Sequence, residues 1–100
     1  MGLVQRLAAG CVAVRRREDR VCEMKRLYVR DGFKGQGCDR ALAEHAIKWA
    51  RRAGYKRMLL DTLPSMAAAQ RLHEDLGFRD LAPYRFNPVS GTRYMELRLG

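Results

Sequence analysis

Three glycines stand within six residues, at Gly32, Gly35 and Gly37, between a strand-like segment and a helical one. A helix that opens from such a loop presents free backbone N–H groups at the positive end of its dipole. Glycine lets the backbone curve tightly and approach a ligand closely, so this loop could seat an anion, most usefully a phosphate. The spacing GxxGxG matches neither the GxxxxGK(S/T) loop of nucleotide-hydrolysing proteins nor the GxGxxG loop of dinucleotide-binding proteins. A glycine-rich turn without a ligand is the alternative.

The cysteines and histidines give no sign of a metal site. Cys11, Cys22 and Cys38 form no CxxC pair, and the two histidines are not spaced as metal ligands. An odd, sparse cysteine count suits reduced thiols in a cytoplasmic protein better than a disulfide framework. Cys11 and Cys22 are most simply explained as small buried hydrophobic residues.

The composition indicates one soluble domain with affinity for anions. An apolar content of 47% and a charged content of 31% in 100 residues are typical of a single globular domain. No apolar run approaches the roughly 18 residues of a membrane span, so no membrane contact is expected. The formal net charge of +9 would suit nucleic acid, a polyanionic cofactor, or a solvated basic face such as the run 15–17.

The elements that must position this loop follow from local patterns. Residues 10–16 and 20–29 predict a hairpin, with Cys22, Met24, Arg26 and Tyr28 on one face of its second strand and Val21, Glu23, Lys25, Leu27 and Val29 on the other. A helical stripe after the glycine loop ends at Gly54, a natural helix terminator. Residues 55–63 predict a buried strand.

A second helix follows Pro64 and ends at Gly77, and residues 78–86 and 92–99 predict two more strands. The order is therefore β-β-α-β-α-β-β, an α+β arrangement. A strand, a crossover helix and a strand imply at least one parallel pair, so the sheet is expected to be mixed.

Two ordered motifs in this chain resemble the GNAT acetyltransferase superfamily. The first is a strand ending in LYV, followed by a loop close to R/Q-x-x-G-x-G/A and a helix; the second, much later, is the helix end LHEDLGF. The resemblance covers about residues 10–99, and PYRFNPVSG and YMELRL resemble the C-terminal pattern of one group of uncharacterised members. It implies a truncated GNAT-like fold, in which residues 1–100 form a single acetyl-CoA-binding domain without the family's N-terminal strand and helices.

The same resemblance assigns a binding site for coenzyme A. Its pyrophosphate would lie on the loop and the first helical turn, at Lys34, Gly35, Gln36, Gly37, Cys38, Asp39 and Arg40. Lys34 stands where the motif has Arg or Gln, and Asp39 stands where it has Gly or Ala. The Asp39 carboxylate should weaken phosphate binding unless it turns away or pairs with Arg40. The pantetheine arm would lie along Leu27, Tyr28 and Val29, and the thioester in the gap where this strand splays from the strand at 55–63.

The implied reaction is direct transfer of an acetyl group from acetyl-CoA to the amine of an unknown acceptor. Glu23 occupies a position where some members have a general base, although it could be an exposed glutamate paired with Lys25 or Arg26. His73 replaces the tyrosine that often acts as general acid, although it could be a helix-surface residue without a role. Tyr28, Tyr84 and Tyr94 are further candidates for proton transfer, and Cys38 is a less favoured nucleophile.

Two other functions stay open. The chain could be a non-catalytic CoA-binding or interaction module, or a basic nucleic-acid-binding protein. The second rests on net charge alone, and no known nucleic-acid motif supports it, so nucleic acid is not expected as a partner.

A homodimer is expected from the missing N-terminal cover. Without that cover, strands near 10–29 should present unpaired backbone and apolar side chains such as Val12, Val14 and Leu27. Pairing with a second copy would bury them.

Overall fold

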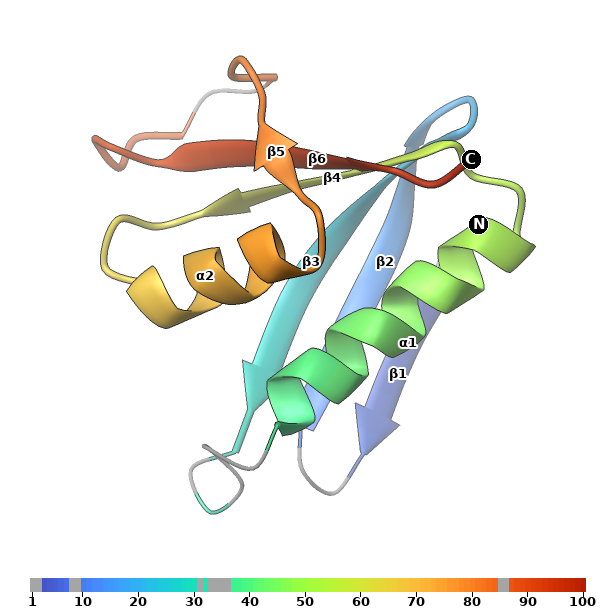
Figure 1. The fold of residues 1–100 in the computed structure, drawn as a ribbon, viewed down its shortest axis with the longest axis horizontal. Helices are drawn as coiled ribbons and strands as arrows, with labels where there is room; N and C mark the ends of the chain where they lie inside the picture. Colours follow the sequence, from blue (N-terminus) through green and yellow to red (C-terminus); the bar gives the residue numbers. More distant parts are fainter. Residues whose placement is uncertain (1–2, 8–9, 31, 33–36, 85–86) are drawn as a thin grey trace.

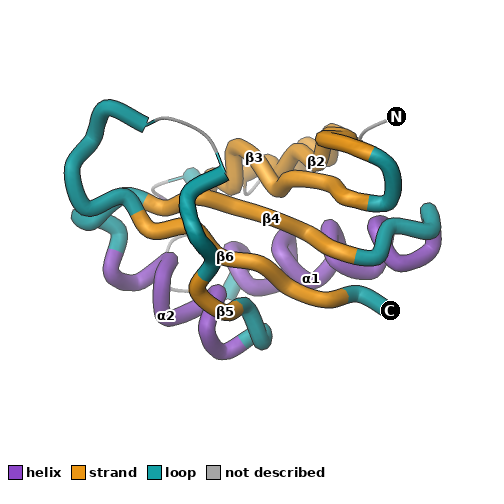
Figure 2. Tube along the Cα trace, turned by 90° about the horizontal axis from the view of Figure 1, so that it is seen from above, coloured by secondary structure: helices purple, strands orange, loops and turns teal. Residues whose placement is uncertain are grey.

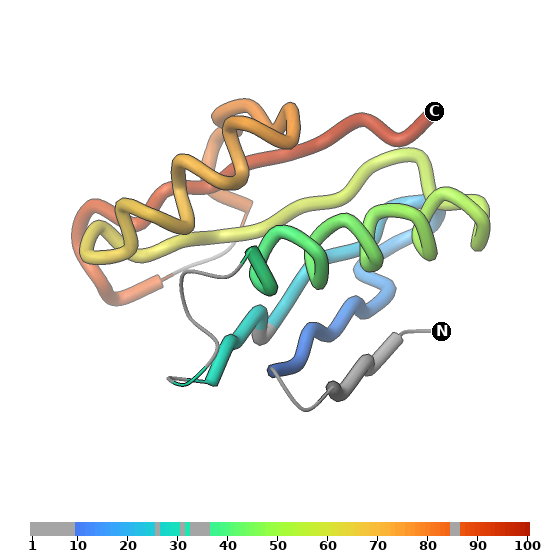
Figure 3. The backbone as a smooth tube through the Cα atoms, turned by 60° about the horizontal axis from the view of Figure 1, so that its bottom comes forward, coloured from blue at the N-terminus to red at the C-terminus, as the bar shows by residue number. Residues whose placement is uncertain are grey.

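The fold is a six-stranded mixed sheet with two helices packed on one of its faces (Figures 1, 2 and 3). The computed structural model describes residues 3–7, 10–30, 32, 37–84 and 87–100. Its helices are α1 (Cys38–Arg52) and α2 (Ala67–Asp75), and its strands are β1 (Leu3–Leu7), β2 (Gly10–Glu18), β3 (Val21–Val29), β4 (Arg57–Thr62), β5 (Arg79–Asp80) and β6 (Arg93–Arg98). Neither described helix is long and apolar enough to cross a membrane.

The strands lie in the order β1-β2-β3-β4-β6-β5, and only β3 and β4 run parallel. The α+β class and the parallel pair across the first helix are thus confirmed. The core lies on the helix side of the sheet, where α1 covers β2 and β3. The buried α1 residues Leu42, Ala43, Ala46, Ile47 and Ala50 share one apolar cluster with Val12, Val14, Cys22 and Met24. Burying a leucine side chain as fully as Leu42 contributes roughly 1.5–3 kcal/mol.

β3 and β4 pair over only the first three residues of each strand. Their register contains only Val21↔Arg57, Cys22↔Met58 and Glu23↔Leu59, although β3 continues to Val29 and β4 to Thr62. The two strands therefore diverge beyond Glu23 and Leu59, as Figure 1 shows. This split is the feature that positions the candidate site.

A bulge in β3 accompanies the split and corrects the predicted alternation. Between the pairs Ala13↔Lys25 and Cys11↔Tyr28, β3 advances three residues while β2 advances two. One extra residue bends a strand and reverses which face its later side chains meet. Leu27 and Val29 consequently pack on the helix side with Cys22 and Met24 rather than opposite them, and Tyr28 is 54% exposed.

The predicted open edge at 10–29 is wrong. Residues 3–7, for which no strand was predicted, form β1 and pair with β2 along its length. Val12 and Val14 are buried in the core under α1 rather than exposed. The edges of the described sheet are therefore β1 and β5. The predicted strand at 78–86 is described as far as Tyr84, and within 78–84 only Arg79–Asp80 pair with a neighbouring strand.

Helix α2 is fixed at its C-terminal end by two local devices. Gly77 adopts φ 103°, and the Phe78 N–H donates to the His73 carbonyl oxygen at 3.0 Å, which closes the helix as predicted. Arg93 of β6 also pairs with Glu74 at 2.8 Å and with Asp80, which raises the pKa of Arg93 and lowers that of Asp80. These contacts hold the last turn of α2, which carries His73, against the sheet.

Candidate functional site

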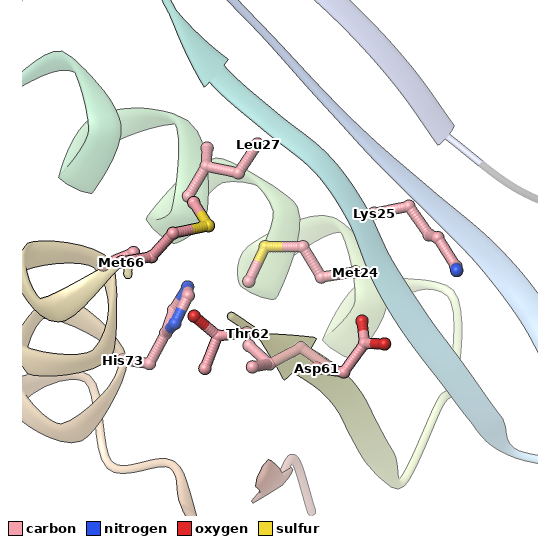
Figure 4. A pocket seen from close by; sticks show the side chains of 9 residues that line it. Met24, Lys25, Leu27, Asp61, Thr62, Met66 and His73 are labelled. Carbon is pink, nitrogen blue, oxygen red and sulfur yellow. The ribbon is translucent and has the colours of Figure 1, made fainter. Parts of the chain in front are cut away.

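Two adjoining clefts occupy the helix side of the split. The first, here the outer cleft, has a volume of about 440 Å³ and is lined by residues 27–29, Asp39, residues 65–69 and Leu72. The second, here the inner cleft, has a volume of about 240 Å³ and is lined by Met24, Lys25, Leu27, Leu60, Asp61, Thr62, Met66, Ala69 and His73 (Figure 4). The two share Leu27, Met66 and Ala69, so they form one path from the start of α1 into the split.

The outer cleft contains the predicted arm-binding strand and reaches the first turn of α1. Leu27, Tyr28 and Val29 all line it, from the part of β3 that has no β4 partner. The α1 segment begins at Gly37, whose φ of 76° favours glycine and whose carbonyl oxygen accepts the first helical hydrogen bond, from Ala41 at 3.0 Å. Cys38 packs against the core beside it. Lys34, Gly35 and Gln36 lie outside the described residues.

Asp39 does not pair with the Arg40 side chain. Its Oδ1 accepts the backbone N–H of Arg40 at 2.8 Å, while the Arg40 guanidinium pairs with Glu44 at 3.5 Å. A carboxylate therefore already occupies one of the free N–H groups at the positive end of α1. An incoming phosphate would have to displace it.

Glu23 is fully buried on the face opposite the helices. Its Oε2 accepts a hydrogen bond from the Tyr84 hydroxyl at 2.8 Å, and Arg15 Nε donates to Oε1 at 3.3 Å. Arg17 and Lys25 lie at 3.8 Å and 3.6 Å from its carboxylate oxygens. The alternative of an exposed strand glutamate is therefore wrong, although the predicted Lys25 contact exists.

Tyr84 reaches Glu23 from the loop between β5 and β6. The Arg17 guanidinium lies 4.5 Å from the centroid of the Tyr84 ring and donates to the Tyr84 carbonyl oxygen at 2.9 Å. The Tyr84 ring also meets Tyr94 edge-on, at 5.2 Å between centroids. Figure 2 shows the loop that follows β5 crossing the helix-free face of the sheet. The bond from Tyr84 to Glu23 therefore connects this loop with β3, past β6 and β4 in the strand order. Of the three candidate tyrosines, Tyr84 thus has a direct hydrogen bond to Glu23, at 2.8 Å.

His73 is buried at the wall of the inner cleft rather than exposed on the helix surface. Only 6% of it is accessible, and neither ring nitrogen has a hydrogen-bond partner among the described residues. Burial lowers the pKa of His73 below its usual 6.5, and the negative charge of Asp39 partly opposes this. The ring packs edge-on against Phe78, with centroids 5.6 Å apart.

Glu23 and His73 therefore stand on opposite sides of the split sheet. His73 is in the inner cleft, and Glu23 is not, but the neighbours of Glu23 along β3, Met24 and Lys25, line it. Lys25 and Asp61 belong to the helix-free face by strand alternation, so the lining of the inner cleft includes residues from both faces of the sheet. Within the described residues, no group of three or more His, Cys, Asp or Glu side chains could hold a metal ion.

Two parts of the site were missed by the sequence patterns. The sequence predicts Thr62 only as one more residue of a buried strand, yet it lines the inner cleft, and its hydroxyl is buried without a hydrogen-bond partner among the described residues. The start of α2 was expected only as a helix, yet residues 66–69 form the wall opposite β3. The signal that could have found that wall is the run of small residues in AAA at 67–69, which leaves room beside a helix.

Comparison with known proteins finds the same family and the same fold elsewhere. The model of the acetyltransferase (GNAT) family matches residues 5–78. An uncharacterised N-acetyltransferase of Schizosaccharomyces pombe is 40% identical over 93 residues, which are 92% of this chain and 57% of that protein.

Two solved structures extend the likeness to three dimensions. A Klebsiella pneumoniae protein, provisionally named an acyl-CoA N-acyltransferase, superposes with a TM-score of 0.84 at 28% identity over 93% of this chain and 65% of that one. YncA of Salmonella typhimurium, whose structure contains acetyl-CoA, superposes with a TM-score of 0.77 at 27% identity over 92% and 58% of the two chains. The present chain thus spans between about half and two thirds of the length of these relatives.

Proposed function

This chain belongs to the acetyltransferase (GNAT) family, and from that membership we propose that it transfers the acetyl group of acetyl-CoA to the amine of an acceptor. The observation that supports the proposal is the split between β3 and β4, with a continuous path of clefts from the start of α1 to His73. The residues present fit acetyl-CoA. The edge of β3 without a β4 partner could bind its amide groups, the N-terminus of α1 could bind its phosphates, and the mainly apolar clefts lie beside both.

In this proposal, the backbone of residues 27–29 binds the pantetheine arm, and the N–H groups at residues 34–40 bind the pyrophosphate. Asp39 opposes the second contact, because its carboxylate holds the Arg40 N–H and carries a like charge. We therefore expect Asp39→Gly to bind CoA more tightly than the wild type. Glu44→Gln, which removes an acidic group one helical turn away, serves as the control because it leaves that N–H occupied.

The proposed chemistry assigns one proton transfer to each side of the split. The acceptor nitrogen bonds to the acetyl carbon as the carbon–sulfur bond breaks, without a covalent bond to the enzyme. Glu23 receives the proton that the amine loses; because Glu23 is fully buried, we route that proton through the Tyr84 hydroxyl bonded to it. His73 supplies a proton to the sulfur of CoA. Because burial lowers the pKa of His73 below 6.5, its protonated form becomes scarce as the pH rises toward 6.5, so kcat should fall with rising pH below that value.

The test is calorimetry with CoA and acetyl-CoA, followed by mass spectrometry of an amine panel. We expect binding in the micromolar to millimolar range and an acetylated product, and we expect Glu23→Gln and His73→Phe to reduce the rate of product formation. Binding without any product would favour the non-catalytic CoA-binding module. An absence of heat and of thermal shift with millimolar CoA would overturn the proposal as a whole. If both variants keep full activity, the two assigned roles are wrong although the activity stands.

We also propose that the protein acts as a cytoplasmic homodimer. The chain has three cysteines, an odd and sparse count that suits the reduced thiols of a cytoplasmic protein better than a disulfide framework. β1 is an edge strand of the described sheet, so its outer backbone groups are a possible pairing site for a second copy. Sedimentation at micromolar concentration measures this directly. A single monomeric species would refute the dimer.

A further inference from the structure

Two buried polar side chains in the inner cleft have no hydrogen-bond partner among the described residues. They are Thr62, which is 4% exposed and whose Oγ1 is unbonded, and His73, which is 6% exposed and whose two ring nitrogens are unbonded. Folded proteins rarely leave buried polar groups unsatisfied, because their loss of hydration is not compensated. No other buried side-chain nitrogen or oxygen in the described part of the chain is in this state. Both lie on the wall of the same cavity.

The rest of the inner cleft is mainly apolar beside this pair. Met24, Leu27, Leu60 and Met66 contribute hydrocarbon and thioether surface, and Lys25 and Asp61 contribute the other polar groups. Figure 4 shows Thr62 and His73 entering the cleft from the end of β4 and from α2, with the two methionines beside them. A ligand that satisfies the pair would therefore be slender and largely apolar, with a hydrogen-bonding atom near its end.

The course of the two clefts indicates which end of acetyl-CoA would lie beside Thr62 and His73. The outer cleft begins at Asp39, in the first turn of α1, where phosphate would bind, and it joins the inner cleft at Leu27, Met66 and Ala69. An arm that starts at the helix end and follows this path brings its far end, the thioester, to Thr62 and His73. A thioester carbonyl oxygen can only accept hydrogen bonds, and the Thr62 hydroxyl is an uncommitted donor.

We infer that Thr62 binds the acetyl carbonyl oxygen of acetyl-CoA through its hydroxyl and so positions the thioester beside His73. This assignment rests on the proposed function and adds a residue to it. The hydrogen bond discriminates between acetyl-CoA and CoA, because CoA ends in a thiol and lacks the carbonyl. Thr62 thus makes the site selective for the loaded donor over the spent one.

The test compares the affinities of CoA and acetyl-CoA in variants of Thr62. Thr62→Val removes the hydroxyl while it keeps the branched shape that suits β4. We expect it to weaken acetyl-CoA about five- to tenfold in calorimetry, the usual worth of one hydrogen bond, and to leave the Kd of CoA within twofold. Thr62→Ser retains the hydroxyl and should restore the preference for acetyl-CoA.

A matched control is available at Thr92. Its hydroxyl donates to the Val89 carbonyl oxygen at 2.7 Å in an exposed turn and lines neither cleft. Thr92→Val should leave the ratio of the two affinities unchanged. Infrared spectroscopy adds a readout independent of affinity: the carbonyl stretch of bound acetyl-CoA should lie lower in the wild type than in Thr62→Val.

The possible outcomes separate this inference from the proposed function. If the wild type binds neither ligand, the proposed function fails and Thr62 loses its role with it. If the wild type binds both and Thr62→Val binds both equally well, the inference is wrong while the proposed function stands. If Thr62→Val weakens both ligands to the same extent, Thr62 contacts the arm that they share, and the assignment to the carbonyl is overturned.

Discussion

Gly10 marks a point where β2 and β3 lie too close for any side chain. It pairs with Val29 at the end of the ladder, next to the residues that line the outer cleft. A Cβ added to Gly10 would lie 2.0 Å from the Tyr28 carbonyl oxygen and 2.9 Å from Val29 Cα, whereas ordinary contact begins at 3.4 Å, a shortfall of 1.4 Å from the oxygen. Both obstacles are backbone atoms, so no side chain can rotate away to make room.

Gly10→Ala must therefore push the two strands apart. Forced overpacking of this kind costs about 1–3 kcal/mol of folding free energy. A loss near the middle of that range would lower Tm by roughly 8–16 °C in a domain of this length. Because the displaced residues Tyr28 and Val29 form one wall of the outer cleft, acetyl-CoA affinity should also fall at temperatures where the variant is still folded.

Urea denaturation and calorimetry on the same samples measure the two effects. Gly32→Ala is the control for stability, since a Cβ at Gly32 would meet nothing within 4 Å. If Gly10→Ala matches Gly32→Ala in unfolding free energy and binds acetyl-CoA as tightly as the wild type, the end of the hairpin relaxes freely. The close approach at Gly10 would then not be a constraint on the fold.

Three further predictions address the interior of the domain. Tyr84→Phe removes a hydrogen bond to the buried carboxylate of Glu23, so the urea unfolding free energy should drop by about 1.5–3 kcal/mol; an unchanged midpoint would contradict the contact. Because the pKa of His73 is lowered in the folded protein, the unfolded chain binds a proton at this position more readily than the folded one does. Tm should therefore fall as the pH drops below 6.5, and the fall should be smaller in His73→Leu. Burial raises the pKa of Cys22 to about 12, so iodoacetamide should label Cys22 only after the protein unfolds. Mass spectrometry measures the labelling, and a rate in the folded protein as high as that of the half-buried Cys38 would refute this prediction.

The elements that were predicted correctly depend on local sequence. Gly54 and Gly77 end their helices with positive φ, and the helical stripe between the glycine loop and Gly54 gives α1 its buried face. The parallel pairing of β3 and β4 followed from the intervening helix alone. Such signals lie within a few residues of the structure that they cause.

The features that were missed depend on residues far apart in the chain. The bulge near Leu27 arises from the alignment of β3 with β2, so a strict two-residue period could not reveal it. Glu23 is buried by Arg17 and Tyr84, and Arg17 and Tyr84 are 67 residues apart. Thr62 lies at the end of the strand that contains the apolar residues 58–60, and that sequence does not reveal whether the Thr62 hydroxyl has a hydrogen-bond partner.

The place of β6 in the sheet has a consequence for how the protein is made. β6 is the last of the described strands in the sequence, yet it lies between β4 and β5 and supplies the whole outer ladder of β4. During translation, the outer edge of β4 therefore stays unpaired until β6 has been synthesised as far as Arg98. Met58 and Leu60 of β4 are incompletely covered for the same period. Unpaired apolar strands of this kind are bound by other nascent chains or by chaperones. The sheet consequently cannot close step by step during translation, and ribosome stalling before residues 93–98 should expose an aggregation-prone intermediate that the finished protein never shows.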